Sequence, residues 1–191
     1  MVQIKFGSFK LGTSPPGFKI IESSILNEYL LFSRYPYLSG VLFSSGEEGK
    51  KPKTELPTLD GWAFSVSLLG GYPPPQNTPK SIALDWEKLS SLKADAIEKT
   101  GNNYTIYEIK DTASSGSLGQ LLTYKWLFEE VLLYPKNTSL VLVCNFIIPG
   151  LVQPLLSNGV RIHSKTNSWS IPQNFRASDI RAASLNYIPI N

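Results

Sequence analysis

The segment from Ser139 to Ile148 constrains the fold more than any other part of the chain. It reads SLVLVCNFII, which is almost wholly apolar and contains several β-branched residues. A strand of this composition is covered on both faces, because a strand with one face in water would alternate apolar and polar residues. We therefore expect a sheet buried between helices, which is an α/β fold.

The neighbouring segments supply partners for this strand. Residues 92–97 and 104–110 alternate as strands do, and Gly101-Asn102-Asn103 between them is typical of a hairpin turn. Residues 118–133 carry apolar side chains at helical spacing, at positions 118, 121, 122, 126, 127, 131 and 132, which predicts that Trp126 lies in the core. A short helix at 151–156 and a strand at 159–163 follow. The predicted order of hairpin, helix, buried strand, short helix and strand indicates a mixed central sheet.

The rest of the chain is predicted to add strands and loops to that core, within a single domain spanning 1–191. We expect an extended arm, a helix that Ser23 or Ser24 caps and that ends near Arg34, and a helix near the C-terminus. The predicted segments are the arm 1–19, strands 39–45 and 62–69, irregular stretches 46–60 and 70–79, the compact core at about 92–163, and the C-terminal helix 177–185.

Composition excludes several classes of protein. With 42% hydrophobic and 17% charged residues, the chain is globular rather than disordered. No run of about 18 apolar residues predicts a membrane span, and the N-terminal residues lack the apolar core of a secretory signal, so we expect an intracellular protein. The single Cys144 and the single His163 argue against a disulfide, a cysteine-rich zinc site or a Ser-His-Asp triad. A net charge of +3 permits nucleic-acid binding.

Two acidic residues lie on the two strands of the predicted hairpin. Alternation directs Glu108 and Lys110 to one face and Ile109 to the other, while the hairpin brings Asp95 next to Glu108. Two carboxylates, the Ile109 backbone carbonyl and water would suit Mg²⁺ or Mn²⁺. Lys110 could then orient a water, accept its proton or stabilise charge on a phosphate. The competing interpretation is a cross-strand ion pair on an exposed sheet face.

The helix that follows adds polar side chains next to this pair. Gln120 and Tyr124 are four residues apart and therefore share a helix face, with Lys125 beside them. Their amide and hydroxyl groups can bind a water or a phosphate, and we expect Lys125 to contact nucleic acid. Alternatively, Gln120 is a surface residue and Tyr124 packs against the sheet.

These motifs resemble those of the PD-(D/E)XK nuclease superfamily, particularly its RecB-type branch with a Gln-x-x-x-Tyr helix. The resemblance covers about residues 92–163 and implies a restriction-endonuclease-like core, a mixed four-stranded sheet flanked by helices. It implies that Asp95 and Glu108 are metal ligands, that Lys110 is the catalytic lysine and that Gln120 and Tyr124 form the helix motif. Ala94 stands where many members have proline. Without further cysteines, no iron–sulfur cluster is expected.

The resemblance also implies an acidic residue from the first helix, for which Glu28 is the first candidate and Glu22 the second. We expect a stand-alone, metal-dependent DNA endonuclease of the kind found in phages and mobile elements, acting as a homodimer or in a larger complex. Lys51 and Lys53 could contact DNA from a flexible loop or be solvated. The alternatives are a catalytically silent DNA-binding or virus-structural module and an RNA endonuclease.

Overall fold

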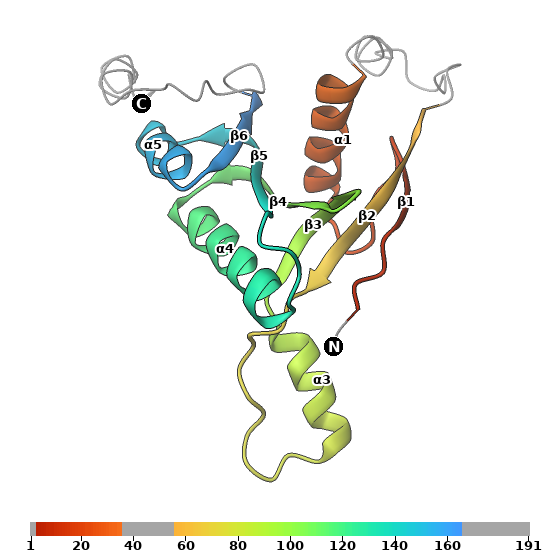
Figure 1. Ribbon diagram of the computed structural model, residues 1–191, viewed down its shortest axis with the longest axis vertical. Helices are drawn as coiled ribbons and strands as arrows, with labels where there is room; N and C mark the ends of the chain where they lie inside the picture. Colours follow the sequence, from red (N-terminus) through yellow and green to blue (C-terminus); the bar gives the residue numbers. More distant parts are fainter. Residues whose placement is uncertain (1–2, 36–55, 166–191) are drawn as a thin grey trace.

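A computed structural model describes residues 3–35 and 56–165, which form one six-stranded sheet with helices on both faces (Figure 1). The strands lie side by side in the order in which they occur in the chain. The elements are β1 (Gly7–Lys10), α1 (Ile20–Arg34), β2 (Thr58–Ser67), α3 (Lys80–Ser90), β3 (Lys93–Thr100), β4 (Asn103–Ala113), α4 (Ser115–Trp126), the π-helical turn η2 (Leu127–Val131), β5 (Ser139–Ile147), α5 (Pro149–Ser157) and β6 (Val160–Ser164).

The sheet is mixed, as predicted. Neighbouring strands from β1 to β4 are antiparallel, whereas β4, β5 and β6 are parallel to one another. The predicted α/β class is therefore confirmed. The four strands predicted between 92 and 163 are β3 to β6, and β1 and β2 extend the sheet to six strands.

Both faces of β5 are buried from Leu140 to Cys144, in agreement with its apolar sequence, whereas Phe146 near its end is 54% exposed. On one face, Val141 and Val143 pack with the buried side of α1. On the other, Leu140, Leu142 and Cys144 pack with α4 and α5. Figure 1 shows the same arrangement, with α1 on one side of the sheet and α4 and α5 on the other. The sheet is thus the middle of three layers.

Helix α1 begins at Ile20, so the prediction that Ser23 or Ser24 caps it is wrong. The Ser23 N–H donates to the Lys19 carbonyl at 2.9 Å, a bond inside the first turn. The Ser23 hydroxyl pairs with that of Ser14 at 2.7 Å. Instead of a serine, the Glu22 carboxylate accepts a hydrogen bond from the Lys19 N–H at 3.0 Å and satisfies the start of the helix.

Helix α4, with the residues that follow it, buries only part of the predicted stripe: Leu121, Leu127 and Leu132 are buried, whereas Leu122, Trp126 and Val131 are exposed. Its sheet-facing side chains include Leu121 and Tyr124, followed by Phe128 in η2. Trp126 lies about 200° around the helix from Tyr124 and is 59% exposed, so its predicted place in the core is wrong. Residues 127–131 form a π-helical turn, which shifts the helical phase that the sequence pattern assumes.

Two elements were not predicted. Strand β1 lies within the predicted arm and pairs with β2, and α3 occupies residues that the sequence analysis leaves unassigned. Figure 1 shows α3 beyond the lower end of the sheet, outside the three layers. The predicted strand 39–45 and helix 177–185 lie outside the described residues. Within 3–35 and 56–165, no helix has the length and apolar character needed to span a membrane.

Candidate active site

Asp95 and Glu108 face the same side of the sheet. The register Ile97↔Ile106 and Ala96↔Tyr107 places Asp95 opposite Glu108 at the next step. Since side chains alternate along a strand, both carboxylates point in the same direction as Ile97 and Ile106, toward the α4 layer. The convergence that the hairpin predicts is therefore present.

The Asp95 side chain replaces a hydrogen bond of the β ladder. Strand pairing between β3 and β4 ends at Ala96↔Tyr107, and from there the Ile109 N–H donates to Asp95 Oδ2 at 2.7 Å. This bond fixes the orientation of the carboxylate. The N–H and C=O of one strand residue point to the same side of the strand, so the Ile109 carbonyl is also on the Asp95 side of β4.

Glu108 is fully buried, and Lys110 is its ionic partner. Lys110 Nζ lies 2.6 Å from Glu108 Oε1, and the lysine side chain remains partly exposed. Glu108 Oε2 is buried with no donor among the described residues. A carboxylate oxygen removed from water without a partner is costly, so this atom is available to a proton or a cation. The exposed surface ion pair that was the competing interpretation does not describe this buried carboxylate.

The electrostatics of the pair favour protonation when no cation is bound. Burial and, after it, the charge of Asp95 raise the pKa of Glu108 to about 8, against the opposing effect of Lys110. Burial also raises the pKa of Asp95, against the hydrogen bond from Ile109 and the charge of Lys110. Burial disfavours the Lys110 ammonium, but the hydrogen bond and charge of Glu108 outweigh that effect, so the pKa of Lys110 is raised. Ionising both Asp95 and Glu108 is therefore unfavourable unless a further positive charge, such as a bound cation, lies between them.

Helix α4 brings Gln120 and Tyr124 to the face of the sheet that bears Asp95 and Glu108. The Tyr124 side chain is buried, and its hydroxyl accepts a hydrogen bond from Gln120 Nε2 at 3.2 Å. Burial raises the pKa of Tyr124, and the charges of Glu108 and Asp95 raise it further, so the phenol lies within their field. It is neutral at physiological pH, and its proton can be donated. The predicted face of Gln120 and Tyr124 therefore adjoins the carboxylates.

The two acidic candidates on the first helix differ in their surroundings: Glu28 forms an ion pair, whereas the charge of Glu22 acts on the groups of the candidate site. Glu28 pairs with Lys165, whose Nζ lies 2.9 Å from Glu28 Oε1. Glu22 instead contributes to the raised pKa values of both Asp95 and Lys110 through its negative charge. The predicted helix started one residue after Glu22, which made Glu28 the natural candidate. Recognising the bond between the Lys19 N–H and Glu22 as a capping contact would have placed Glu22 in the first turn.

Lys125, one of the predicted nucleic-acid contacts, is not brought to this site. Lys125 donates to the Thr138 carbonyl at 2.9 Å and lies 3.8 Å from Glu129. Because Thr138 immediately precedes β5, while Lys110 is level with Cys144 further along that strand, Lys125 points to the other end of the sheet. Lys51 and Lys53 lie outside the described residues.

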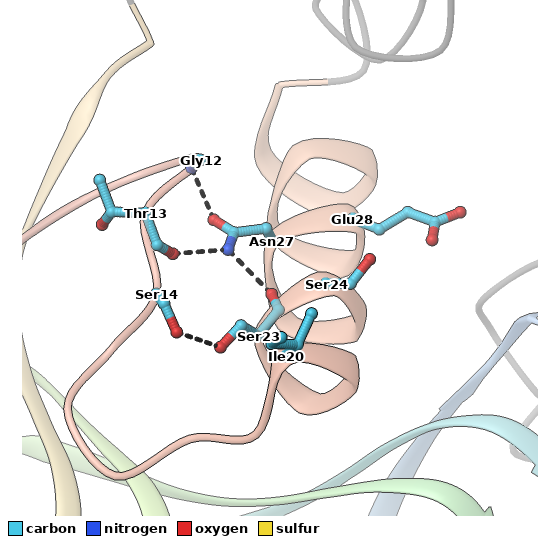
Figure 2. A pocket seen from close by; sticks show the side chains of 8 residues that line it. All are labelled: Gly12, Thr13, Ser14, Ile20, Ser23, Ser24, Asn27 and Glu28. Atoms are coloured by element: carbon cyan, nitrogen blue, oxygen red, sulfur yellow. Dashed lines mark hydrogen bonds between the residues drawn. The ribbon is translucent and has the colours of Figure 1, made fainter.

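A polar pocket lies between residues 12–14 and α1 (Figure 2). Asn27 occupies its centre, accepting from the Gly12 N–H at 2.7 Å and donating to the Thr13 carbonyl at 2.9 Å. The Ser14 and Ser23 hydroxyls pair with each other. These groups bind the loop to the helix, so the pocket lacks the unpaired buried acceptor that Glu108 provides.

The donor set fits a divalent cation in part. Among the described residues, no group of three or more histidine, cysteine or acidic side chains is close enough to hold a metal. A site at Asp95 and Glu108 would therefore use two carboxylates, the Ile109 carbonyl and water, which is the oxygen-rich and incomplete shell typical of Mg²⁺. The unpaired Glu108 Oε2 is the observation that supports this fit.

Comparison of the chain with protein-family models, with curated proteins and with solved structures gave no match.

Proposed function

We propose that this protein is a metal-dependent endonuclease that hydrolyses phosphodiester bonds in DNA, with its centre at Asp95, Glu108 and Lys110. The observation that carries the proposal is the buried Glu108 carboxylate, which has one oxygen on the Lys110 ammonium and the other without a donor among the described residues. A group of this kind destabilises the fold, which favours a functional role over a structural one.

The arrangement around the carboxylates supports the same proposal. Strands β3 to β6 form a mixed sheet within the six-stranded sheet, which supports the restriction-endonuclease-like core that the motifs imply, and α4 follows β4 directly. The acidic pair, the lysine two residues later and the Gln120–Tyr124 face all lie on one side of this sheet. A binding module without catalysis would not require a buried acidic pair whose oxygens compete for one proton.

Each residue has a distinct chemical role in the proposed reaction. Mg²⁺ or Mn²⁺ held by Asp95, Glu108 and the Ile109 carbonyl would supply a Lewis acid and a bound water of lowered pKa. The hydrogen bond from Ile109 keeps Asp95 oriented without a large side-chain movement. Lys110 is exposed enough to turn its ammonium from Glu108 to a phosphate oxygen, where it stabilises the negative charge of the transition state.

Helix α4 supplies neutral hydrogen-bond donors next to Asp95 and Glu108. Because the Tyr124 hydroxyl already accepts from Gln120, its own proton is directed to another acceptor, such as a phosphate oxygen or a water. Its raised pKa keeps this proton in place throughout the neutral range. Tyr124 would therefore position a negatively charged substrate oxygen without adding charge.

Plasmid cleavage tests the proposal. Supercoiled DNA is incubated with the full chain in Mg²⁺ or in EDTA, using Asp95→Asn, Lys110→Met and the matched control Lys136→Met. Lys136 pairs with Glu130 on the surface and is outside the site. We expect cleavage that requires Mg²⁺, falls at least about 100-fold in the two site variants and is unchanged in the control.

The other outcomes identify the alternatives. Cleavage that persists in both site variants contradicts the proposed centre. Retained DNA binding without cleavage favours the non-catalytic module. Parallel digestion of single-stranded and double-stranded DNA and RNA distinguishes a deoxyribonuclease from an RNA endonuclease.

A further inference from the structure

The segment that carries α3 is an arm, residues 68–92, whose two ends are bound to each other. The Leu68 N–H donates to the Leu92 carbonyl at 2.8 Å, and the Leu92 N–H donates to the Leu69 carbonyl at 3.1 Å. The two ends of the arm, which we call its stem, also pack closely at Gly71. An added Cβ there would be only 2.5 Å from the Ser90 carbonyl carbon. The stem therefore holds the helix in a defined orientation relative to the sheet.

Helix α3 presents an apolar stripe that the described chain leaves exposed. Ile82, Trp86 and Leu89 are spaced four and three residues apart, so they lie on one face. Their exposed fractions are 54%, 41% and 82%, and Tyr72 at the stem is 80% exposed. Together these four side chains expose an apolar area on the order of 500 Å², taking aromatic side chains as 150–250 Å² each and aliphatic ones as somewhat less.

A helix of this length is not expected to be stable without a partner. It has 11 residues, and isolated helices shorter than about 12–15 residues are marginal in water. No other described helix or strand packs along it, and Figure 1 shows it clear of the three layers. Most of the stability of such a helix comes from burial of its apolar face, so something must cover Ile82, Trp86 and Leu89.

We propose that a second copy of this chain covers α3, with the two α3 helices packed antiparallel about a two-fold axis. A two-fold contact uses the same patch on both subunits, which requires a patch that is complementary to itself. The stripe meets this condition, because Ile82 of one copy would face Leu89 of the other while the two Trp86 side chains meet near the axis. With Tyr72 included, the two copies would bury on the order of 1,000 Å² in total, which is the size of a small interface whose formation depends on protein concentration.

Figure 1 shows α3 beyond the end of the sheet and outside the three layers, so the proposed contact uses the arm and neither face of the sheet. One particle would then carry two copies of the candidate site. If the proposed nuclease function holds, one dimer could cut both strands of a duplex. This consequence rests on the proposed function, whereas the dimer itself does not.

The mass of the full chain in solution, measured between about 1 and 100 μM, tests the proposal. The variants are Trp86→Glu and Leu89→Glu, and Trp126→Glu is the matched control, because Trp126 is an exposed tryptophan on α4 and is not part of the α3 stripe. We expect the wild type and the control to reach twice the 21.2 kDa chain mass, and both arm variants to associate at least about 30-fold more weakly.

Disulfide trapping gives a second readout that introduces no charge. In the double variant Ile82→Cys/Leu89→Cys, the two thiols of one chain are seven residues apart on a helix and too distant to join each other. The native Cys144 is buried. Mild oxidation should therefore yield a covalent dimer, whereas Trp126→Cys should not.

Three results would overturn the proposal: a monomer at 100 μM, a dimer that survives both charged variants, or no covalent dimer from the double cysteine variant. A monomer at 100 μM would mean that the arm is not covered by a second copy, and this includes the case in which a different protein covers it. Both measurements are made without DNA or metal, so their failure is distinguishable from failure of the proposed nuclease activity.

Discussion

Replacing Glu108 with glutamine should stabilise the metal-free protein at alkaline pH, even though it removes a residue of the candidate site. Burial and the charge of Asp95 raise the pKa of Glu108 from 4.5 to about 8. A folded-state pKa above the unfolded value means that stability is greatest at low pH and is lost as the pH rises from about 4.5 through about 8. Above that range both states are ionised, and the folded state bears the full cost of the buried anion.

The size of this effect follows from the same pKa. At about 1.36 kcal/mol per pKa unit, ionising Glu108 costs the folded state about 5 kcal/mol. Water and the partly exposed Lys110 relax around a new charge and relieve some of that cost, so we expect a gain of about 2–4 kcal/mol in Glu108→Gln at pH 9. At pH 5 the native carboxyl is protonated and resembles the amide, and the difference should fall to about 1 kcal/mol or less.

Urea unfolding of both proteins in EDTA at pH 5 and pH 9 measures this difference. Glu130→Gln is the control, because Glu130 forms an exposed pair with Lys136 and should change the free energy of unfolding by less than about 0.5 kcal/mol at either pH. Mg²⁺ should raise the stability of the wild type at pH 9 and leave Glu108→Gln unchanged. The reasoning is refuted if the variant is equally or less stable than the wild type at pH 9.

The remaining predictions concern the surroundings of the site. Tyr124→Phe should reduce Mg²⁺-dependent cleavage about 10-fold or more while shifting the free energy of unfolding by only about 1 kcal/mol, measured by initial rates and urea unfolding, because it removes one donor beside the carboxylates. Glu22→Gln should lower the pH at which Asp95 titrates, whereas Glu28→Gln should not, as followed by carboxyl NMR chemical shifts. Glu98→Gln should cost about 1–3 kcal/mol in urea unfolding, since the buried carboxylate pairs with Arg34 and accepts from a tyrosine hydroxyl; a change below about 0.5 kcal/mol would contradict this.

The parts of the fold that were predictable are those that local sequence specifies. The turn between β3 and β4 contains Gly101, whose φ of 61° suits glycine, and the strands on either side alternate regularly. Strand β5 is identified by its apolar run alone. Since the hairpin fixes which side chains lie opposite one another, Asp95 and Glu108 could be placed together without knowing the rest of the molecule.

The parts that were missed depend on distant contacts or on geometry that composition does not encode. Strand β1 is short and is defined by its pairing with β2, about 50 residues away in the chain. Trp126 was placed in the core because a uniform helical period was assumed, and the π-helical turn that follows it breaks that period. Helix α3 follows a proline-rich stretch, and no partner in the described chain marks its apolar face as buried.

The candidate site was predictable to the same extent. Residues of the hairpin and of α4 are close in sequence, and the structure brings them to one side of the sheet. The choice between Glu22 and Glu28 instead depends on the residue at which α1 begins and on the pairing of Glu28 with Lys165, which is 137 residues away. The direction of Lys125 likewise follows from Thr138 and Glu129, contacts that helical periodicity does not predict.

Anomalous diffraction from a crystal soaked in Mn²⁺ tests most directly whether the two carboxylates form a metal centre. We predict one strong peak within coordination distance, about 2.0–2.4 Å, of oxygens from Asp95 and Glu108, with the Lys110 ammonium displaced from its contact with Glu108. The peak should be absent in Glu108→Gln. A peak elsewhere, or none while Lys110 remains on Glu108, would contradict the account.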